Sequence, residues 1–139
     1  MFADMKSMVT KAWREQYALL AINCMNLESA RAAVRVAEKH RAPIILNLYQ
    51  GHLGHFPAPI AVAVVKTLAE EASVPVALAL DHGKDPVRIR QAFRAGFSGL
   101  MIDASAFALE ENIRQTRDVV TLAASAGVCV EGELGHLGD

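Results

Sequence analysis

The chain has 139 residues, of which 53% are hydrophobic, and its formal net charge at pH 7 is −1. This size allows one domain with a real core, and the nearly neutral charge excludes the basic surface that nucleic-acid binding requires. No apolar run approaches the roughly 20 residues of a membrane span, and the first residues lack the pattern of a secretory signal peptide. The two cysteines, Cys24 and Cys129, lie far apart without metal-ligand spacing. We therefore expect a cytoplasmic protein with reduced thiols that binds neither nucleic acid nor a membrane.

Short apolar segments typical of β-strands alternate with segments of helical periodicity along the whole chain. The expected strands cover residues 18–23, 43–49, 74–80, 99–103 and 127–133. Helices between successive strands give a βαβαβαβαβ order, which requires a parallel sheet in an α/β fold. Two architectures fit this order: an open, doubly wound sheet, or an incomplete (β/α)8 TIM barrel with about five parallel strands. No linker interrupts the pattern, so residues 1–139 are expected to form a single unit.

The helix boundaries are indicated by capping residues. Asn26 is an N-cap candidate before the first of these helices, and a second helix is expected over residues 59–72. Asp85 followed by Pro86 predicts the start of a third helix, which Gly96 should end. Ser105 is expected to cap a fourth helix, with one face formed by Leu109, Ile113, Thr116 and Val120.

Alternate side chains in each expected strand differ in polarity. In the third strand Val76, Leu78 and Leu80 form one set, and the other set ends in Asp81. The same change toward polar residues occurs at the C-terminal end of the other strands. A barrel explains this pattern, because its outer face packs on helices and its mouth holds the chemistry. An open sheet buries both faces, so the pattern favours the incomplete barrel.

Four carboxylates are expected at this mouth: Asp81, Asp103, Glu131 and Glu133. At an effective dielectric near 20, each like-charged pair costs on the order of 2 kcal/mol, so some acids are protonated or a cation lies among them. The adjacent His82 favours a divalent transition metal, because imidazole and carboxylates together suit such ions. The alternative is that these acids cap helices or pair with arginines such as Arg88 or Arg94.

These residues and their neighbours resemble the class II, metal-dependent ketose-bisphosphate aldolase family. The matching segments occur in family order and span nearly the whole chain: AINCMNLE (residues 21–28), PVALALDHG (75–83), GFSGLMIDAS (96–105), EENIRQT (110–116) and VEGELGHLG (130–138). A lone Asp-His-Gly would be a weak signal, whereas the ordered set is specific.

The resemblance implies a zinc enzyme that cleaves or forms a carbon–carbon bond in a sugar phosphate. It implies that His82 is a Zn2+ ligand, that Glu133 and Asp103 belong to the metal site, and that Asp81 is the catalytic acid/base. Asn23 and Asn47 are expected to contact the substrate. A Lewis acid with a proton-transferring carboxylate does not need a Schiff-base lysine, so Lys84 is interpreted as a solvated turn residue.

Two positions depart from the family pattern. Ala79 stands where many relatives have a histidine, and Tyr49 replaces a serine that helps to hold a phosphate. This second change favours a sugar monophosphate or an unphosphorylated ketose derivative over a bisphosphate. Another metal-dependent barrel lyase acting on a non-bisphosphate sugar is therefore one alternative function.

The family barrel needs about twice this length, since a TIM barrel has roughly 250 residues. We therefore interpret the chain as the N-terminal half of an aldolase that is inactive until the C-terminal half is supplied. A homo-oligomer or a complementary barrel half is the expected protein partner. The alternative is a non-catalytic barrel fragment that acts only in assembly.

The remaining histidines give weaker signals. His52 and His55 have i,i+3 spacing but fall in a Gly/Pro loop, so they are interpreted as loop residues. His136 is left open between a loop role and a substrate contact. The N-terminal segment with Trp13 is expected to close the bottom of the barrel, and Met5 and Met8 to act in packing.

Overall fold

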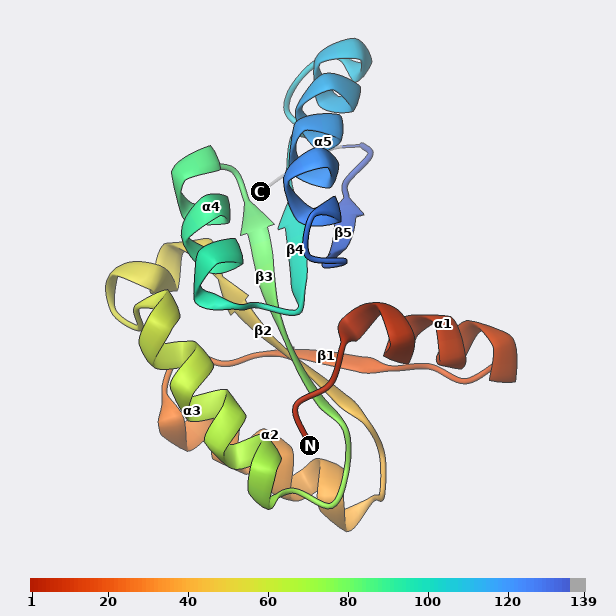
Figure 1. The fold of residues 1–139 in the computed structure, drawn as a ribbon, viewed down its shortest axis with the longest axis vertical. Coiled ribbons are helices and arrows are strands. Elements are labelled where there is room, and N and C mark those ends of the chain that lie inside the picture. The colour runs from red at the N-terminus through yellow and green to blue at the C-terminus, as the bar shows by residue number, and fades with distance from the viewer. Residues whose placement is uncertain (136–139) are drawn as a thin grey trace.

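The five strands form one parallel sheet in the order β1-β2-β3-β4-β5. The structure is a computed structural model that describes residues 1–135 (Figure 1). Its elements are α1 (Met5–Glu15), β1 (Leu20–Asn23), α2 (Leu27–Lys39), β2 (Ile44–Tyr49), the 3-10 helix η1 (Gln50–Gly54), α3 (Ala58–Glu71), β3 (Val76–Gly83), α4 (Pro86–Ala95), β4 (Gly99–Ile102), α5 (Leu109–Ala124) and β5 (Cys129–Gly132).

The strand order decides between the two expected architectures. Each strand pairs with its neighbour in the chain, and all four pairings are parallel. Right-handed crossovers between sequential strands place all the connecting helices on one face of the sheet. A doubly wound sheet would instead reverse its order and place helices on both faces. The prediction of an incomplete barrel with five parallel strands is therefore confirmed.

The two faces of the sheet carry two separate apolar clusters. The outer face contributes Leu46, Leu78 and Leu100 to a large core shared with the helices, which includes Val34 of α2 and Ile89 of α4. Burial on both faces of the sheet explains the long apolar sequence of β3, whose first five residues are buried. The alternation read from the sequence thus assigned the helix-facing side chains correctly.

The inner face carries a smaller cluster at its N-terminal end. Met5 and Met8 of α1 pack there on Ile45, Ala77 and Ala79. Helix α1 therefore covers the end of the sheet opposite the polar strand ends, and the two methionines have the packing role expected for them. The same helix leaves Trp13 77% exposed.

Three predicted helix boundaries are confirmed by their capping contacts. The Asn26 side chain accepts a hydrogen bond from the Ser29 N–H (2.9 Å), and the Asp85 side chain accepts one from Val87 (2.8 Å). Gly96 ends α4 in the left-handed conformation, with φ of 97°. These contacts involve only neighbours in sequence, which is why the sequence alone could predict them.

The prediction for α5 is wrong at its start and along its face. The helix begins at Leu109 after Ala108, and Ser105 contacts a carboxylate instead of capping it. Leu109 and Ile113 are exposed, whereas Asn112 is buried and donates a hydrogen bond from Nδ2 to the Glu133 carbonyl (2.8 Å). A buried polar contact thus sets the orientation of the helix, and apolar periodicity could not detect it.

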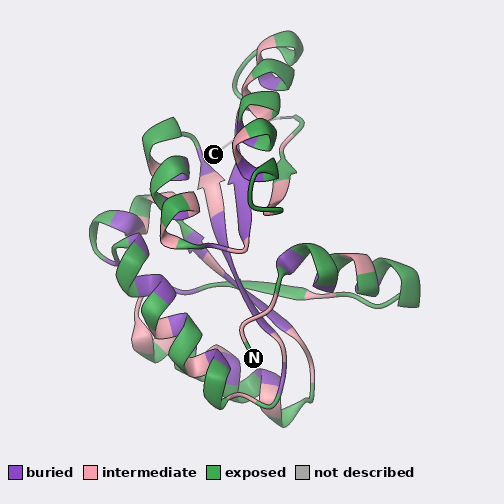
Figure 2. Cartoon of the chain, viewed as in Figure 1, coloured by how far each residue is buried: buried purple, intermediate pink, exposed green. Residues whose placement is uncertain are grey.

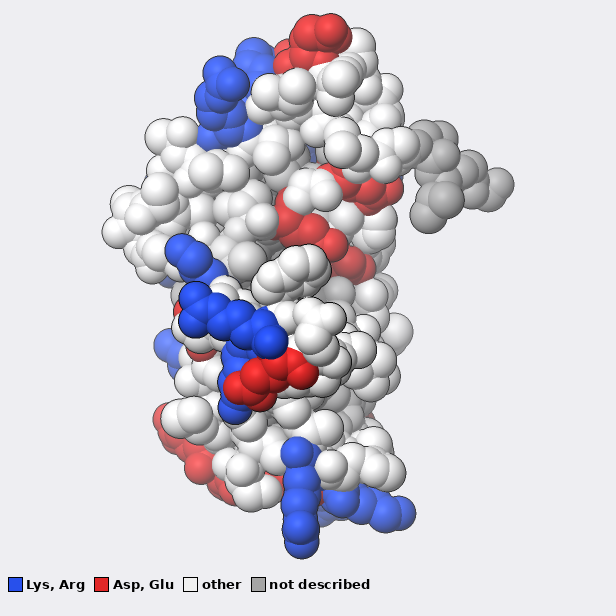
Figure 3. Space-filling model, turned by 90° about the vertical axis from the view of Figure 1, so that its right-hand side faces the viewer, with Lys and Arg blue, Asp and Glu red and all other residues white. Residues whose placement is uncertain are grey.

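All residues of the edge strand β1 are exposed, whereas the central strands β2, β3 and β4 are mostly buried (Figure 2). Leu20 and Ile22 in β1 are 62% and 40% exposed, so the outer face of this strand lacks the cover that the central strands have. On the face viewed in Figure 3, acidic side chains form a band in the upper half and no continuous basic surface is visible. Within residues 1–135, no helix combines the length and apolarity needed to cross a membrane.

Candidate functional site

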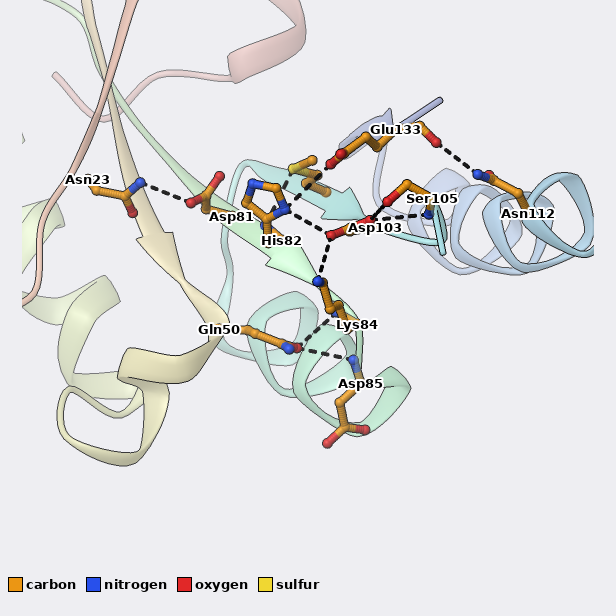
Figure 4. Close-up of polar contacts among 11 residues, drawn as sticks. Asn23, Gln50, Asp81, His82, Lys84, Asp85, Asp103, Ser105, Asn112 and Glu133 are labelled. Carbon is orange, nitrogen blue, oxygen red and sulfur yellow. Dashed lines mark hydrogen bonds and ion pairs between the residues drawn. The ribbon is translucent and has the colours of Figure 1, made fainter. Parts of the chain in front are cut away.

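The candidate site lies at the C-terminal ends of β3, β4 and β5 (Figure 4). Asp81 and His82 lie near the C-terminal end of β3, Asp103 follows β4 directly, and Glu133 follows β5. Parallel pairing places these ends at one edge of the sheet, although the residues are up to 52 positions apart in sequence (133 − 81). Short strands that end in polar residues therefore bring three acids and an imidazole together.

His82 is the centre of this group. Its Nδ1 atom donates a hydrogen bond to Asp103 Oδ2 (2.9 Å) and lies 3.4 Å from Glu133 Oε2. One potential ligand atom from each of the three residues lies within 4.8 Å of the other two. The tyrosine ring of Tyr49 lies edge-on to the imidazole, with the ring centroids 6.4 Å apart.

Asp103 is the buried carboxylate of the group, with a side chain 3% exposed. The Ser105 hydroxyl donates to its Oδ1 atom (2.6 Å), and Lys84 Nζ lies 3.3 Å from Oδ2. Burial raises the pKa of Asp103, but the hydrogen bonds from Ser105 and His82 outweigh burial and hold this pKa well below its usual value. Asp103 is therefore ionised at neutral pH.

The pKa of the His82 imidazole is shifted in the opposite direction, upward. The hydrogen bond to Asp103 raises the pKa of His82 and outweighs burial, which lowers it, while the nearby charges of Asp81 and Glu133 add to the rise. The His82 side chain is 42% exposed, so water and solutes can reach it.

Asp81 is oriented away from this trio toward β1. Its Oδ2 atom accepts a hydrogen bond from Asn23 Nδ2 (2.9 Å), across the strand that lies between them. Asn47 occupies that intervening strand, in register with Asn23 on one side and Ala79 on the other. The structure thus brings Asn23 into direct contact with Asp81 and places Asn47 between their strands.

A cavity of about 500 Å³ connects these groups. It is lined by Asp81, His82, Met101, Glu131 and Glu133, together with residues that follow β5. The alternative in which the acids pair with nearby arginines finds no support at Arg88, whose guanidinium donates to Gln91 instead. The four acids expected at the mouth therefore lie around one cavity or, in the case of Asp103, directly behind it.

Comparison with known proteins identifies the family. The family model for class II fructose-bisphosphate aldolase matches residues 3–139. The chain belongs to this family. It is 42% identical over 140 residues to the fructose-bisphosphate aldolase of Geobacillus stearothermophilus, covering 97% of this chain and 48% of that protein. It is 40% identical over 142 residues to the 6-phospho-5-dehydro-2-deoxy-D-gluconate aldolase of Bacillus subtilis, covering 99% and 48%.

A solved structure extends this relation to the fold. The YdjI aldolase from Escherichia coli K12 superposes with a TM-score of 0.90 at 33% identity, over 99% of this chain and 54% of that one. The chain spans about half the length of the curated relatives that it matches. The half barrel inferred from strand order therefore corresponds to part of a class II aldolase barrel.

Several site residues of this class II aldolase chain were missed by sequence reasoning. Ser105 was expected to cap a helix and Lys84 to be solvated, yet both contact Asp103. Gln50 Oε1 accepts hydrogen bonds from the backbone N–H groups of Lys84 (2.9 Å) and Asp85 (3.1 Å), and so links the loops after β2 and β3. A serine two residues after an aspartate is a local turn signal that could have identified the Ser105 contact.

Two further histidines of the described part of the chain lie outside this group. His52 lies in η1, in the loop after β2. Its ring contacts the Tyr49 ring edge-on, with the centroids 5.5 Å apart. His55 follows η1 and is exposed. His136 lies outside the described residues, so its role stays a prediction.

Class II aldolases depend in general on a metal ion, and the donor atoms of this site fit one. Glu133 Oε2 is buried and has no hydrogen-bond partner among the described residues, although it lies 3.4 Å from His82 Nδ1. A buried carboxylate oxygen without a donor is costly unless a cation satisfies it. One imidazole nitrogen with two carboxylates is a donor set suited to Zn2+.

Proposed function

We propose that this chain supplies the metal-binding and proton-transfer residues of a zinc-dependent aldolase that forms or cleaves a carbon–carbon bond in a ketose phosphate. The observation that carries the proposal is the convergence of His82, Asp103 and Glu133 within one small group, beside an aspartate with a fixed orientation. Membership of the class II family supports the reaction type.

His82 and Glu133 are the residues that would hold the ion. Zinc, when bound, would supply a Lewis acid for the carbonyl group of the substrate. Asp103 acts behind them, because Ser105 and Lys84 already occupy its two oxygens. Its buried negative charge keeps the imidazole in a fixed orientation, as carboxylates do for many metal-ligating histidines.

Asp81 would move the proton. Its carboxylate faces the same cavity as His82, and the Asn23 amide holds one of its oxygens. The other oxygen remains available to take a proton from a substrate hydroxyl and to return it in the reverse direction. Asn23 would therefore act on the reaction through the orientation of Asp81 as well as through the substrate.

A complete catalytic site requires more ligands than residues 1–135 bring together. A catalytic zinc ion has three protein ligands and an open position, and Asp103 is already satisfied by its neighbours. We propose that the further ligands come from the second half of the barrel and that the chain alone is inactive. The exposed outer face of β1 is consistent with a partner that covers it.

The substrate proposal includes a second candidate. The two relatives named above are called a fructose-bisphosphate aldolase and an aldolase of a 6-phospho sugar acid. Tyr49 places an aromatic ring beside His82 where the family resemblance implies a phosphate-holding serine. An aromatic ring in place of that serine removes a hydroxyl that could hold a phosphate, so the substitution favours a ketose monophosphate over a bisphosphate.

The test measures zinc binding and retro-aldol activity with a panel of ketose mono- and bisphosphates. The chain is assayed alone and mixed with the separately produced second half of a full-length relative. We expect activity only in the mixture, its loss in His82→Ala, and no effect of His40→Ala, which removes an exposed histidine at the end of α2. Inactivity of the mixture, despite assembly, would favour the non-catalytic assembly fragment. Activity that survives His82→Ala would contradict the proposed metal site.

A further inference from the structure

The pairing of β3 with β4 is irregular at the site. Leu80 pairs with Leu100, but the next pair joins Gly83 to Ile102. Two residues of β3, Asp81 and His82, therefore lie opposite the single residue Met101 of β4. This is the residue count of a β-bulge, a feature that is rare in parallel pairs and enriched beside active sites.

The bulge changes which way consecutive side chains point. In a regular strand Asp81 and His82 would face opposite sides of the sheet. Here both line the same cavity, Asp81 turned toward Asn23 and His82 toward Asp103 (Figure 4). The extra residue in β3 thus allows an acid and an imidazole that are adjacent in sequence to act in one site.

The backbone of His82 is in the left-handed region, with φ of 48°. Side chains other than glycine adopt this conformation at a cost, and it persists only where the surroundings hold it. The bulge also removes the amide of His82 from the regular pairing with β4. That amide donates instead to the thioether sulfur of Met101, at 3.3 Å from nitrogen to sulfur.

Met101 also contacts the residue after the bulge. A Cβ atom on Gly83 would collide with the Met101 carbonyl oxygen, so β3 approaches β4 closely again only because residue 83 is glycine. The Met101 side chain thus accepts the hydrogen bond from the His82 amide, and the Met101 carbonyl lies against Gly83, the next residue of β3. Met101 is itself 8% exposed, so water does not replace the sulfur freely.

We propose that Met101 is a positioning residue for the metal site, whose sulfur holds the His82 bulge and thereby the direction of the imidazole. This inference rests on the proposed role of His82 as a zinc ligand. Methionine suits the task because it is unbranched, fills an irregular gap and offers a weak acceptor. Leucine would fill similar space but would leave the part-buried His82 amide without this acceptor.

The experiment compares the wild-type chain with Met101→Leu, which removes the acceptor, and Met101→Gln, which restores an acceptor on an unbranched side chain. Met8→Leu is the matched control, because Met8 is similarly buried (7%) and packs at the far end of the sheet. The first readout needs no metal: a positive φ at His82 brings its amide and α protons close together and gives a strong intraresidue NMR cross-peak. The second readout is the Kd for Zn2+.

We expect Met101→Leu to weaken the cross-peak and to raise the Kd about tenfold, as loss of a group that orients a metal ligand does. Met101→Gln should retain both properties, and Met8→Leu should change neither. An unchanged cross-peak and Kd in Met101→Leu would overturn the proposal. A wild-type chain that lacks the strong cross-peak would overturn it as well, whether or not the leucine variant folds.

Failure of the two proposals can be told apart. If the wild-type chain shows the cross-peak but His82 binds no zinc, the proposed function fails, and the cross-peak in Met101→Leu alone decides whether the sulfur holds the bulge. If zinc binds at His82 equally well in both proteins, the metal site stands and the role of Met101 does not.

Discussion

At the scale of single residues, the site is organised around a buried negative charge. Asp103 receives hydrogen bonds from Ser105 and His82 and an ion pair from Lys84, and its pKa is held low as a result. The charge in turn raises the pKa of His82 and fixes the position of its Nδ1 atom. The largest influence on the imidazole therefore comes from Asp103, which is held in place by residues that do not line the cavity.

Removing one of these supports should weaken metal binding. Ser105→Ala deletes the hydroxyl that donates to Asp103 Oδ1 and leaves only the longer bond from the residue 105 N–H (3.2 Å), so the carboxylate is held less firmly and His82 loses part of its orientation. We expect the Kd for Zn2+ to rise about tenfold, measured by competition with a chromophoric chelator. Ser125→Ala is the control, since the Ser125 hydroxyl bonds only to a nearby carbonyl at the end of α5. An equal effect of both substitutions would contradict the role given to Ser105.

The raised pKa of His82 predicts how the stability of the metal-free chain depends on pH. Protonated His82 is favoured in the folded state by Asp103, so its contribution is complete below the ordinary pKa of 6.5 and is lost as pH rises through the folded-state value. We expect His82→Gln to be less stable than wild type at about pH 5.5, by less than about 1 kcal/mol because the exposed imidazole is screened, and nearly equal at about pH 9. Urea unfolding of both proteins measures this difference, and a difference that grows with pH would contradict the assignment.

At the scale of elements, the decisive feature is the bulge in β3. Gly83 permits the close approach to β4 that ends it, because a side chain there would meet the Met101 carbonyl and the Ile89 side chain. The Met101 carbonyl belongs to the main chain of β4, so it cannot move aside as the end of a flexible side chain can.

Gly83→Ala should therefore destabilise the chain by about 1–3 kcal/mol, the usual cost of overpacking. It should also weaken zinc binding, since His82 directly precedes the displaced strand. Gly54→Ala is the control, because a Cβ atom at Gly54 meets nothing within 4 Å. The midpoints of urea unfolding measure the effect, and equal midpoints for the two variants would show that β3 and β4 can separate freely.

The sequence predicted the elements better than the contacts between them. The five strands and the caps at Asn26 and Asp85 were predictable because alternation and capping depend on neighbours in sequence. The face of α5 was not, because Asn112 is turned inward by the Glu133 carbonyl, 21 positions away. The bulge at His82 also escaped prediction, since it exists only relative to Met101 in another strand.

At the scale of the whole molecule, the chain forms a curved part of a barrel with two free edges. Strands β1 and β5 each have one strand neighbour within the described residues, and β1 exposes Leu20 and Ile22 on its outer face. The chain also spans about half the length of its curated relatives. The family, the fold and the grouping of His82, Asp103 and Glu133 agree with one another, while the reaction itself stays a proposal.

The central claim is that His82 and Glu133 bind a divalent ion beside Asp81, with Asp103 orienting the imidazole from behind. A crystal structure of the chain with Zn2+, with data collected at the zinc absorption edge, tests it most directly. We predict an anomalous peak at about 2.0–2.2 Å from a ring nitrogen of His82 and from a Glu133 oxygen, the usual lengths of such bonds. A peak at His52 or His55 with none at His82, or no peak in the cavity with zinc in excess, would contradict the account.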